Sequence, residues 1–353
     1  PRSRIGETRF QIRFSVGEIL SGAYKLSIRI AGTGSYVPAR TLTNADLGKM
    51  VGTSDEWIRT RTGIEERRIA APEQATSDLA YEAGRRALEM AGIEGSELSA
   101  IVVATITPDH VFPSTACILQ RRFGAAGAFC FDLEAACSGL LYSLEVAYSL
   151  MKTNRKYKRV LVIGAEKLSC ITDWTDRNTC VLFGDGAGAV LLENTDEEGP
   201  DCVLASDLHA DGNYTDILVM PAGGSRMPSS EETVKNRLHS IRMAGKETFK
   251  LAVPSMVSAS RKVLEDAGVS PSEIKLVVPH QANQRIIHAV AQRLDVPEDR
   301  VFENIRFYGN TSAASIGICF DEIVRGKLIE RGDKVLLTAF GGGLTWGAIL
   351  LRF

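Results

Sequence analysis

The chain has 353 residues, 44% of them hydrophobic and 24% charged, which is the composition of a globular protein large enough for two core-bearing units. Its formal net charge of −2 gives no signal for nucleic acid or an anionic membrane surface. The seven cysteines include no Cys-x-x-Cys, which argues against a disulfide framework or zinc spacing and favours a reducing, cytoplasmic compartment.

The chain begins with an arginine-rich stretch that carries no apolar signal-peptide core. We predict that residues 1–24 are a disordered arm or vector-derived, and that the first strand begins at Leu26. The longest apolar run, residues 335–351, is interrupted by glycines at 341–343 and 347, so we predict no transmembrane helix.

An internal duplication is visible in the middle of the chain. Residues 85–93 (Arg-Arg-Ala-Leu-Glu-Met-Ala-Gly-Ile) match residues 261–269 (Arg-Lys-Val-Leu-Glu-Asp-Ala-Gly-Val) at an offset of 176. The apolar strands, helices and glycine-rich turns that follow keep the same order in both copies. Because strands and helices alternate, we predict two pseudo-symmetric α/β halves, at residues 26–198 and 199–353, with mixed sheets covered by helices.

Cys137 follows an apolar run at residues 128–133, which predicts a buried strand, and opens a helical pattern that extends to Met151. A cysteine at a strand-to-helix junction faces free N–H groups and the positive end of the helix dipole. Both favour the thiolate, so we expect a pKa lowered toward neutrality and a nucleophilic role. The other six cysteines are interpreted as small core residues.

Two further polar residues fall on equivalent turns. His280 ends an apolar strand before an amphipathic pattern at residues 281–290, and Asn310 lies in a glycine turn before a small-residue helix start. Cys, His and Asn together also describe a papain-like hydrolase, in which Asn orients His. Because Asn310 occupies the same kind of turn as Cys137, we expect it to point at the substrate, where two donors on one thioester oxygen would stabilise an enolate.

The motifs around these residues resemble those of the β-ketoacyl-acyl carrier protein synthase III family of the thiolase superfamily. The resemblance rests on Ala135-Ala-Cys-Ser-Gly139, Pro279-His-Gln-Ala-Asn283 and Gly309-Asn-Thr-Ser-Ala-Ala-Ser315, with weaker signatures at residues 53–64 and 340–346. It covers residues 26–353 and implies a thiolase-like fold in which two βαβαβαββ halves form αβαβα layers. The pairing of His with Asn resembles the initiating synthases, whereas elongating synthases carry two histidines.

The resemblance implies an acyltransferase that joins a short acyl-CoA primer to malonyl-acyl carrier protein by decarboxylative Claisen condensation, initiating fatty acid synthesis. Cys137 would carry the acyl group, and its N–H with that of Gly342 would form the oxyanion hole. His280 and Asn310 would hold the malonyl thioester oxygen during loss of CO2. No metal or other cofactor is implied, and acyl-CoA is a substrate.

The resemblance also assigns residues to substrate handling. Trp57 and Arg177 would enclose the adenine of coenzyme A, Arg61 and Thr53 would assist at the nucleotide, and Asn283 would line the pantetheine tunnel. A basic surface would receive the acidic carrier protein, and a homodimer would close each acyl pocket with Phe112 of the partner copy. The expected docking residues are Arg285, Lys250 and Arg293, and the expected acyl-pocket residues are Phe112, Phe183, Leu168 and Leu208.

Three other interpretations remain open at this point. In the first, the protein would be a specialised synthase III-like enzyme of secondary metabolism. In the second, it would be a cysteine thioester hydrolase, and in the third a non-catalytic chain-length factor on the same fold. The last of these loses the nucleophile, whereas Cys137, His280 and Asn310 are all present here. The fragments Gly184-Asp-Gly-Ala-Gly188 and Gly32-Thr-Gly34 do not complete a dinucleotide fingerprint, so we reject nicotinamide binding.

Overall fold

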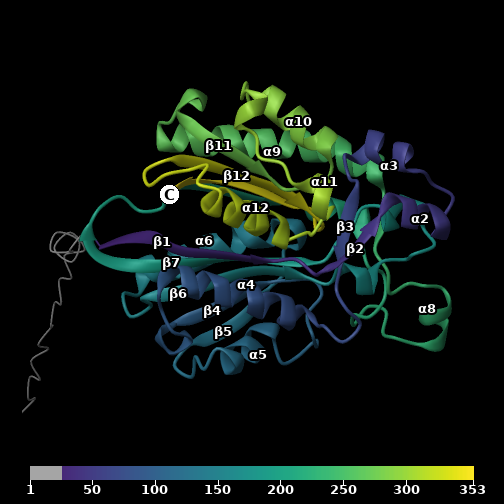
Figure 1. Ribbon diagram of the computed structural model, residues 1–353, viewed down its shortest axis with the longest axis horizontal. Coiled ribbons are helices and arrows are strands. Elements are labelled where there is room, and N and C mark those ends of the chain that lie inside the picture. The colour runs from purple at the N-terminus through teal and green to yellow at the C-terminus, as the bar shows by residue number, and fades with distance from the viewer. Residues whose placement is uncertain (1–25) are drawn as a thin grey trace, which may run out of the picture.

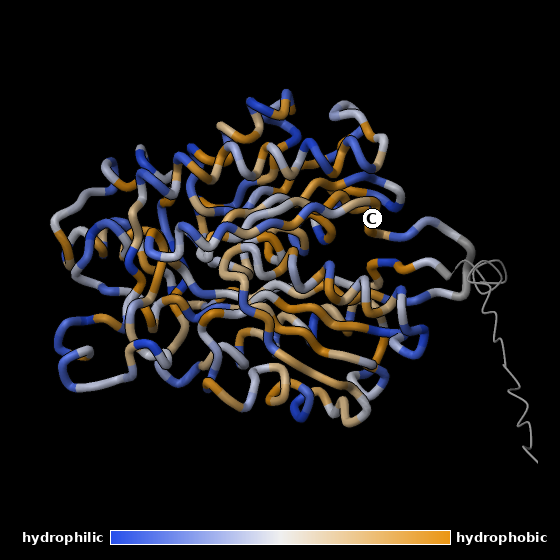
Figure 2. The backbone as a smooth tube through the Cα atoms, turned by 180° about the vertical axis from the view of Figure 1, so that it is seen from behind, coloured by the Kyte–Doolittle hydropathy of each residue, from blue (hydrophilic) through white to orange (hydrophobic). Residues whose placement is uncertain are grey.

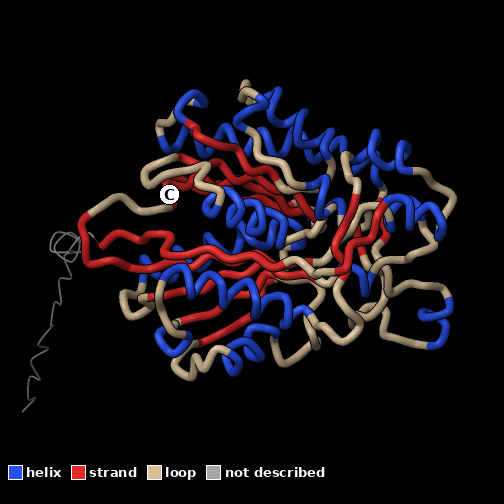
Figure 3. The backbone as a smooth tube through the Cα atoms, in the orientation of Figure 1, coloured by secondary structure: helices blue, strands red, loops and turns tan. Residues whose placement is uncertain are grey.

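The structure, a computed structural model, describes residues 26–353 (Figure 1). The extension predicted at residues 1–24 lies outside these described residues. Two large sheets are stacked with helices between and outside them, as the alternation of strands and helices in the sequence requires (Figure 3).

Five strands form the first large sheet, in the spatial order β1-β7-β6-β4-β5. β4 pairs in parallel with both β5 and β6, whereas β7 pairs antiparallel with β6 and β1. The inner strand β4 is buried along its whole length because helices cover both faces of the sheet and strands flank it on both sides. The bounds are β1 Leu26–Tyr36, β4 Ala100–Ala104, β5 Phe129–Leu133, β6 Arg159–Glu166 and β7 Gly186–Glu198.

The second large sheet has the order β11-β12-β13-β8, with β8 at Val203–Ala210, β11 at Ile274–Pro279, β12 at Lys334–Gly341 and β13 at Thr345–Arg352. At the position of β5 in the first sheet, the second has only an isolated bridge between Val277 and Val301. The two halves therefore have the same strand arrangement, except that the second half has a single bridge where the first half has β5. Each sheet takes its strands from one side of the boundary at residues 198–199, which we keep as a proposal.

Helices α6 and α12 lie between the two sheets, α4 and α5 cover the outer face of the first sheet, and α9 and α10 cover the outer face of the second (Figure 1). This αβαβα layering confirms the predicted fold class. The bounds are α4 Thr76–Ala91, α5 Thr115–Arg122, α6 Gly139–Thr153, α9 Gly245–Ala267, α10 Gln284–Arg293 and α12 Ala314–Arg325.

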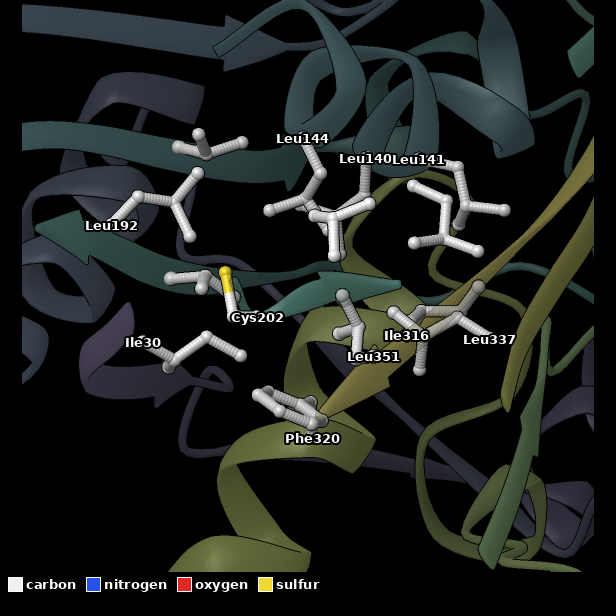
Figure 4. Close-up of a cluster of buried hydrophobic side chains, with 14 of the residues drawn as sticks. Ile30, Leu140, Leu141, Leu144, Leu192, Cys202, Ile316, Phe320, Leu337 and Leu351 are labelled. Carbon is white, nitrogen blue, oxygen red and sulfur yellow. The ribbon is translucent and has the colours of Figure 1, made fainter. Parts of the chain in front are cut away.

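The core of the central layer joins the two halves. Leu140, Leu144, Ile316 and Phe320 of the central helices pack among residues of both sheets, Ile30 and Leu337 for example (Figure 4). Apolar residues likewise concentrate along the sheets in Figure 2, and hydrophilic residues on the outer helices. Backbones also approach closely here, since a Cβ added to Gly188 of β7 would lie 2.3 Å from the carbonyl carbon of Gly317 in α12. Such contact fixes the start of α12 against the first sheet.

Smaller elements gather at one end of the molecule, beside α3 in Figure 1. They are β2 Arg40–Thr43, α2 Asn44–Met50, α3 Asp55–Thr62, β3 Glu66–Ile69, α7 Arg177–Cys180, β9 Leu218–Val219, α8 Glu231–Lys235, β10 Arg242–Met243 and α11 Ile305–Tyr308. None of the helices in residues 26–353 combines the length and the apolar character that a membrane crossing requires.

Strand β5 differs from its prediction as a buried strand. All five of its residues are only partly buried, because β5 is the edge of its sheet and pairs with β4 alone. The apolar run alone does not reveal this, since an edge strand and a central strand can share the same composition. The neighbouring loop exposes 93% of Val111 and 84% of Phe112.

Candidate active site

One cavity of about 1260 Å³ contains the three residues singled out from the sequence. Cys137, His280 and Asn310 all line it, although they lie up to 173 residues apart in the chain. They come from the turn before α6, the end of β11 and the turn before α12. The layered fold therefore brings the equivalent turns of the two halves to a common site.

Cys137 lies in the short 3-10 turn Ala136–Ser138 that leads into α6. Ala136 has a φ of 45°, which is unusual for a residue with a side chain, so the backbone here is strained. The β12–β13 turn packs directly on it: a Cβ added to Gly341 would lie 2.7 Å from the Cys137 nitrogen. Only glycine at 341 permits this approach, which places Gly342 in the same cavity wall.

The expected low pKa of Cys137 is wrong for this structure. The side chain is partly accessible, yet protein atoms surround its sulfur, and burial raises the pKa of the Cys137 thiol to about 12. The nearby Glu166 carboxylate acts in the same direction, whereas the neighbouring Ser312 side chain opposes the shift. The sequence argument considered the helix end alone, and loss of hydration outweighs it.

His280 is buried, with 2% of its surface exposed, and burial lowers the pKa of its imidazole to about 3. It is therefore neutral. Its Nδ1 lies 2.6 Å from Ser315 Oγ, which also accepts a hydrogen bond from the Gln281 nitrogen. This arrangement favours donation from the Ser315 hydroxyl to Nδ1, which leaves the hydrogen on Nε2. Nε2 is buried and has no hydrogen-bond partner within residues 26–353, so it is available to a group in the cavity.

Asn310 is held by backbone and side-chain bonds alike. Its nitrogen donates to Leu182 O at 2.8 Å, and its carbonyl accepts from the Gly184 nitrogen at 3.0 Å. The side-chain Oδ1 accepts from the Ser312 nitrogen at 2.8 Å. Because its oxygen is occupied in this way, the amide group presents its NH2 as a donor. Asn310 is not the N-cap of α12, since Ala313 takes that position.

The site therefore contains one sulfur nucleophile and two neutral nitrogen donors, which suits thioester chemistry that passes through an enolate. Sequence reasoning overlooked three supporting residues. Ser315 orients His280, and Glu166 is fully buried while accepting hydrogen bonds from Thr105, Ile106 and Thr107. The third, Ser312, has a buried Oγ with no hydrogen-bond partner among the described residues. Glu166 could have been found from the sequence, because an acidic residue at the end of an apolar strand is rarely buried unless it has a partner.

Of the residues expected to bind coenzyme A, only Asn283 is among those that line the cavity, and Trp57, Arg61, Arg177 and Thr53 are not. The Arg61 and Arg177 guanidinium carbons lie 4.6 and 4.7 Å from the centre of the Trp57 ring. Arg177 thus contacts the indole directly, where the prediction had a purine between them. Asn283 lines the cavity and donates to Arg61 O at 3.0 Å, and Thr53 Oγ1 is buried without a partner.

Leu168 and Phe183 line the cavity as expected; Phe112 borders the cavity of its own chain, whereas the prediction has it closing the pocket of the partner copy. Leu208 does not line the cavity, and its assignment is corrected. It lies on β8, pairs with Gly347 of β13 and packs against the central core. A strand register was needed to see this, because alternation along β8 decides which face each side chain takes.

The expected docking residues Arg285, Lys250 and Arg293 are all exposed. Arg285 and Arg293 lie on α10, which begins at Gln284 and not at residue 281, since Asn283 accepts from the Arg285 nitrogen and caps the helix. Lys250 lies within α9, which begins at Gly245. No group of three or more His, Cys, Asp or Glu side chains in residues 26–353 is arranged to hold a metal ion.

Comparison with known families gives two matches within the chain. The family described as 3-oxoacyl-[acyl-carrier-protein (ACP)] synthase III matches residues 131–212, and the one described as its C-terminal part matches residues 264–353. Both matched segments contribute to the cavity.

Individual relatives agree with these matches. The chain is 54% identical to the β-ketoacyl-[acyl-carrier-protein] synthase III of Caldanaerobacter subterraneus subsp. tengcongensis, over 93% of this chain and 98% of the relative. The crystal structure of the corresponding protein of Aquifex aeolicus is 50% identical over 93% of this chain and 100% of its own, with a TM-score of 0.85. The priming β-ketosynthase of the R1128 polyketide pathway has the same TM-score at 35% identity, over 93% of this chain and 97% of its own.

Proposed function

The chain belongs to the β-ketoacyl-[acyl-carrier-protein] synthase III family, and on that premise we propose a role for each polar residue of its cavity. The protein is an acyltransferase that catalyses the initiating condensation of fatty acid synthesis. Its substrates are an acyl-CoA and malonyl-acyl carrier protein, and the products are a β-ketoacyl-acyl carrier protein, CoA and CO2. We propose that this chemistry needs no metal or cofactor, because the side chains of the cavity supply a nucleophile and the donors for an enolate.

In the first half-reaction, the Cys137 sulfur attacks the acyl-CoA thioester. A tetrahedral intermediate forms, the bond to the coenzyme A sulfur breaks, and the thiol proton ends on the released CoA. We assign the Cys137 and Gly342 N–H groups to the intermediate's oxygen, since the glycine turn is packed against the Cys137 backbone. The raised pKa of the thiol means that proton removal must accompany attack.

In the second half-reaction, His280 Nε2–H and the Asn310 amide donate to the thioester oxygen of the malonyl group. Loss of CO2 leaves an enolate whose charge these two donors stabilise. The enolate carbon attacks the acyl-cysteine, the carbon–sulfur bond breaks, and Cys137 regains a proton. A neutral imidazole suits this step. A protonated His280 would form an ion pair with the malonyl carboxylate and so stabilise the group that must leave as CO2, and burial keeps the imidazole unprotonated.

The observation that carries this proposal is the convergence of Cys137, His280 and Asn310 on one cavity. The test is intact-protein mass spectrometry after incubation with acetyl-, isobutyryl- and longer acyl-CoA, followed by malonyl-acyl carrier protein. We expect an acyl adduct on Cys137 that disappears with release of CO2 and formation of a β-ketoacyl product. An adduct that only hydrolyses would overturn the proposal in favour of a hydrolase.

For coenzyme A we propose the mouth formed by Trp57, Arg61, Arg177 and Thr53, with Asn283 along the tunnel. The indole between two guanidinium groups offers a flat, cationic surface suited to a purine and its phosphates. Binding of the adenine between Trp57 and Arg177 requires the guanidinium to leave the ring. Tryptophan fluorescence during titration with CoA would report that rearrangement and should be unchanged in Trp57→Phe.

For the carrier protein we propose docking on the exposed face of Arg285, Arg293 and Lys250, since an acidic partner favours a cationic surface. For the acyl group we propose the cavity wall of Leu168 and Phe183, closed by Phe112 of a second copy. The free edge of β5 and the exposed Val111 and Phe112 support a homodimer that pairs along this edge. Light scattering should give twice the chain mass, and Phe112→Asp should lower it.

We also propose a cytoplasmic location, in keeping with seven free cysteines and with substrates of central metabolism. The relatives do not favour the alternatives of a specialised enzyme of secondary metabolism or a thioester hydrolase, since relatives that are 49–54% identical to this chain carry the synthase III name. The boundary that we propose at residues 198–199 separates Cys137 from His280 and Asn310, so the reaction needs side chains from both halves of the chain.

A further inference from the structure

Two cysteines outside the catalytic site lie in direct contact. The Sγ atoms of Cys117 and Cys130 are 3.2 Å apart, although the thirteen-residue separation carries no recognised spacing. Both are free thiols in this structure, and Cys117 is exposed. The expectation that all non-catalytic cysteines are packed core residues is therefore wrong for Cys117, as it is for the exposed Cys170.

The contact is held by the elements on either side of it. Cys117 is the third residue of α5, and Cys130 is the second residue of β5, the strand that α5 covers (Figure 1). Asp132, two residues further along β5, accepts from the Thr115 and Ala116 nitrogens at 2.7 and 2.8 Å. This carboxylate fastens the start of α5 to the strand, so the two sulfurs are kept together by the fold.

The composition of the cluster indicates which chemistry it can support. A bound metal would need a third ligand, and no group of three such side chains exists in the described part of the chain. Asp132 is already engaged by the two helix nitrogens. Two thiols that are in contact, one of them open to solvent, can instead form a disulfide when the sulfurs close from 3.2 Å to about 2.05 Å.

We propose that Cys117 and Cys130 form a redox-sensitive modification site, which closes to a disulfide by exchange with a low-mass disulfide such as oxidised glutathione. The Cys117 thiolate attacks one sulfur of oxidised glutathione, whose S–S bond breaks and releases one reduced glutathione. The Cys130 thiol then loses its proton and attacks the Cys117 sulfur of the mixed disulfide. The second glutathione leaves as a thiol, so two protein thiols are oxidised and one glutathione disulfide is reduced.

The order of attack follows from exposure. Cys117 is open to a reagent, whereas burial, and then the hydrogen bond with Cys117, raise the pKa of the Cys130 thiol to about 12. Cys130 therefore acts second, once the mixed disulfide has brought an attackable sulfur beside it. Because Cys130 also lines the active-site cavity, the new bond would join α5 to the cavity wall next to the loop of Val111 and Phe112.

The test equilibrates the full chain in buffers with increasing ratios of oxidised to reduced glutathione. Reactions are then quenched with acid and alkylated, followed by intact mass measurement and peptide mapping. We expect the loss of two hydrogens, two fewer alkylated thiols and a linked pair of peptides that contain Cys117 and Cys130. Dithiothreitol should reverse all three. The oxidised form should melt roughly a few degrees higher than the reduced form, since a cross-link restricts the unfolded chain.

Three variants distinguish this site from general thiol oxidation. Cys130→Ser should stop at a stable glutathione adduct on Cys117, and Cys117→Ser should form neither the adduct nor the cross-link. Cys170→Ser, which removes another exposed cysteine, is the matched control and should form the cross-link as the unmutated chain does. The proposal fails if both thiols stay alkylatable in the most oxidising buffer, if a glutathione adduct persists on the unmutated Cys117, or if Cys130 links to another cysteine.

Discussion

The turn before α6 and the turn before α12 occupy the same place in the two halves but differ in what they offer to a substrate. Each contains one non-glycine residue in the left-handed region, Ala136 with a φ of 45° and Ser312 with a φ of 49°. The first turn presents the sulfur of Cys137 to the cavity. The second holds Asn310 as a donor and buries the Ser312 hydroxyl. The two halves therefore share a strained backbone at this turn, but they present different reactive side chains to the cavity.

The strand ends that precede these turns differ in the same way. After β4, Thr105 turns its hydroxyl inward to the buried Glu166. After β11, His280 directs Nε2 to the cavity. The first half therefore supplies the nucleophile and a buried acid, and the second half supplies two neutral donors. If this division is right, damage to each half should affect a different step of the reaction.

The largest effect is expected for Cys137→Ser, which removes the nucleophile of the first half. Acyl capture and condensation should both fall by about a thousandfold or more. Mass spectrometry of the acyl-enzyme and a carbon dioxide release assay measure the two steps. Cys319→Ser, which keeps a donor to Asn304, is the control and should retain acylation. Condensation at a normal rate in Cys137→Ser would disprove a covalent intermediate.

His280→Ala and Asn310→Ala should damage only the second step. Each removes one donor to the enolate, so decarboxylation should fall by about a hundred- to a thousandfold while acylation of Cys137 stays near normal. His288→Ala is the control, because His288 is exposed and paired with Glu303. A variant that acylates poorly yet decarboxylates normally would reverse the roles of the two halves.

Glu166→Gln tests the buried acid of the first half through stability. Burial raises the pKa of Glu166 from 4.5 to about 7, so between these pH values the folded protein keeps a proton that the unfolded chain releases. The free energy of unfolding should therefore fall as the pH rises from about 4.5 to 7, by roughly 3 kcal/mol in total from this group.

Thermal melting at pH 5 and pH 7.5 measures this effect. The Gln variant cannot ionise, so its melting temperature should change less between the two pH values than that of the unmutated chain. Asp46→Asn is a useful comparison, because Asp46 is an exposed acid whose pKa is lowered by hydrogen bonds with Thr43 and Lys49. An unchanged pH slope in Glu166→Gln would mean that Glu166 ionises freely in the folded protein.

The smallest effect is expected on the outer surface of the second half. Arg285→Glu should raise the KM for malonyl-acyl carrier protein by about tenfold, while acylation by acyl-CoA changes little. The difference should shrink at high salt. Arg121→Glu is the control, since Arg121 is exposed on α5, the outer helix of the first half. Equal losses with both substrates would indicate a folding defect in place of a docking surface.

Much of the fold followed from local patterns. The repeat at residues 85–93 and 261–269 indicated two halves, and apolar runs indicated β4, β11 and β12. Cys137 and His280 were found because each stands where a strand gives way to a helix, and Asn310 because it lies in a glycine turn before a helix. Those signals survive in sequence because periodicity and turn residues depend on near neighbours. The predictions that were wrong concerned the burial of individual residues, which depends on neighbours that are distant in the chain.

Sequence by itself therefore determined the fold class, the duplication and the identity of the three cavity residues. Only the tertiary structure decided that β5 is an open edge, that Leu208 faces away from the cavity and that Cys117 touches Cys130. It also decided that burial outweighs the helix end at Cys137 and keeps His280 neutral. One physical reason applies to all of these cases. The exposure and the protonation of a group depend on every element packed around it, and those elements are distant in the sequence and come together only in the folded chain.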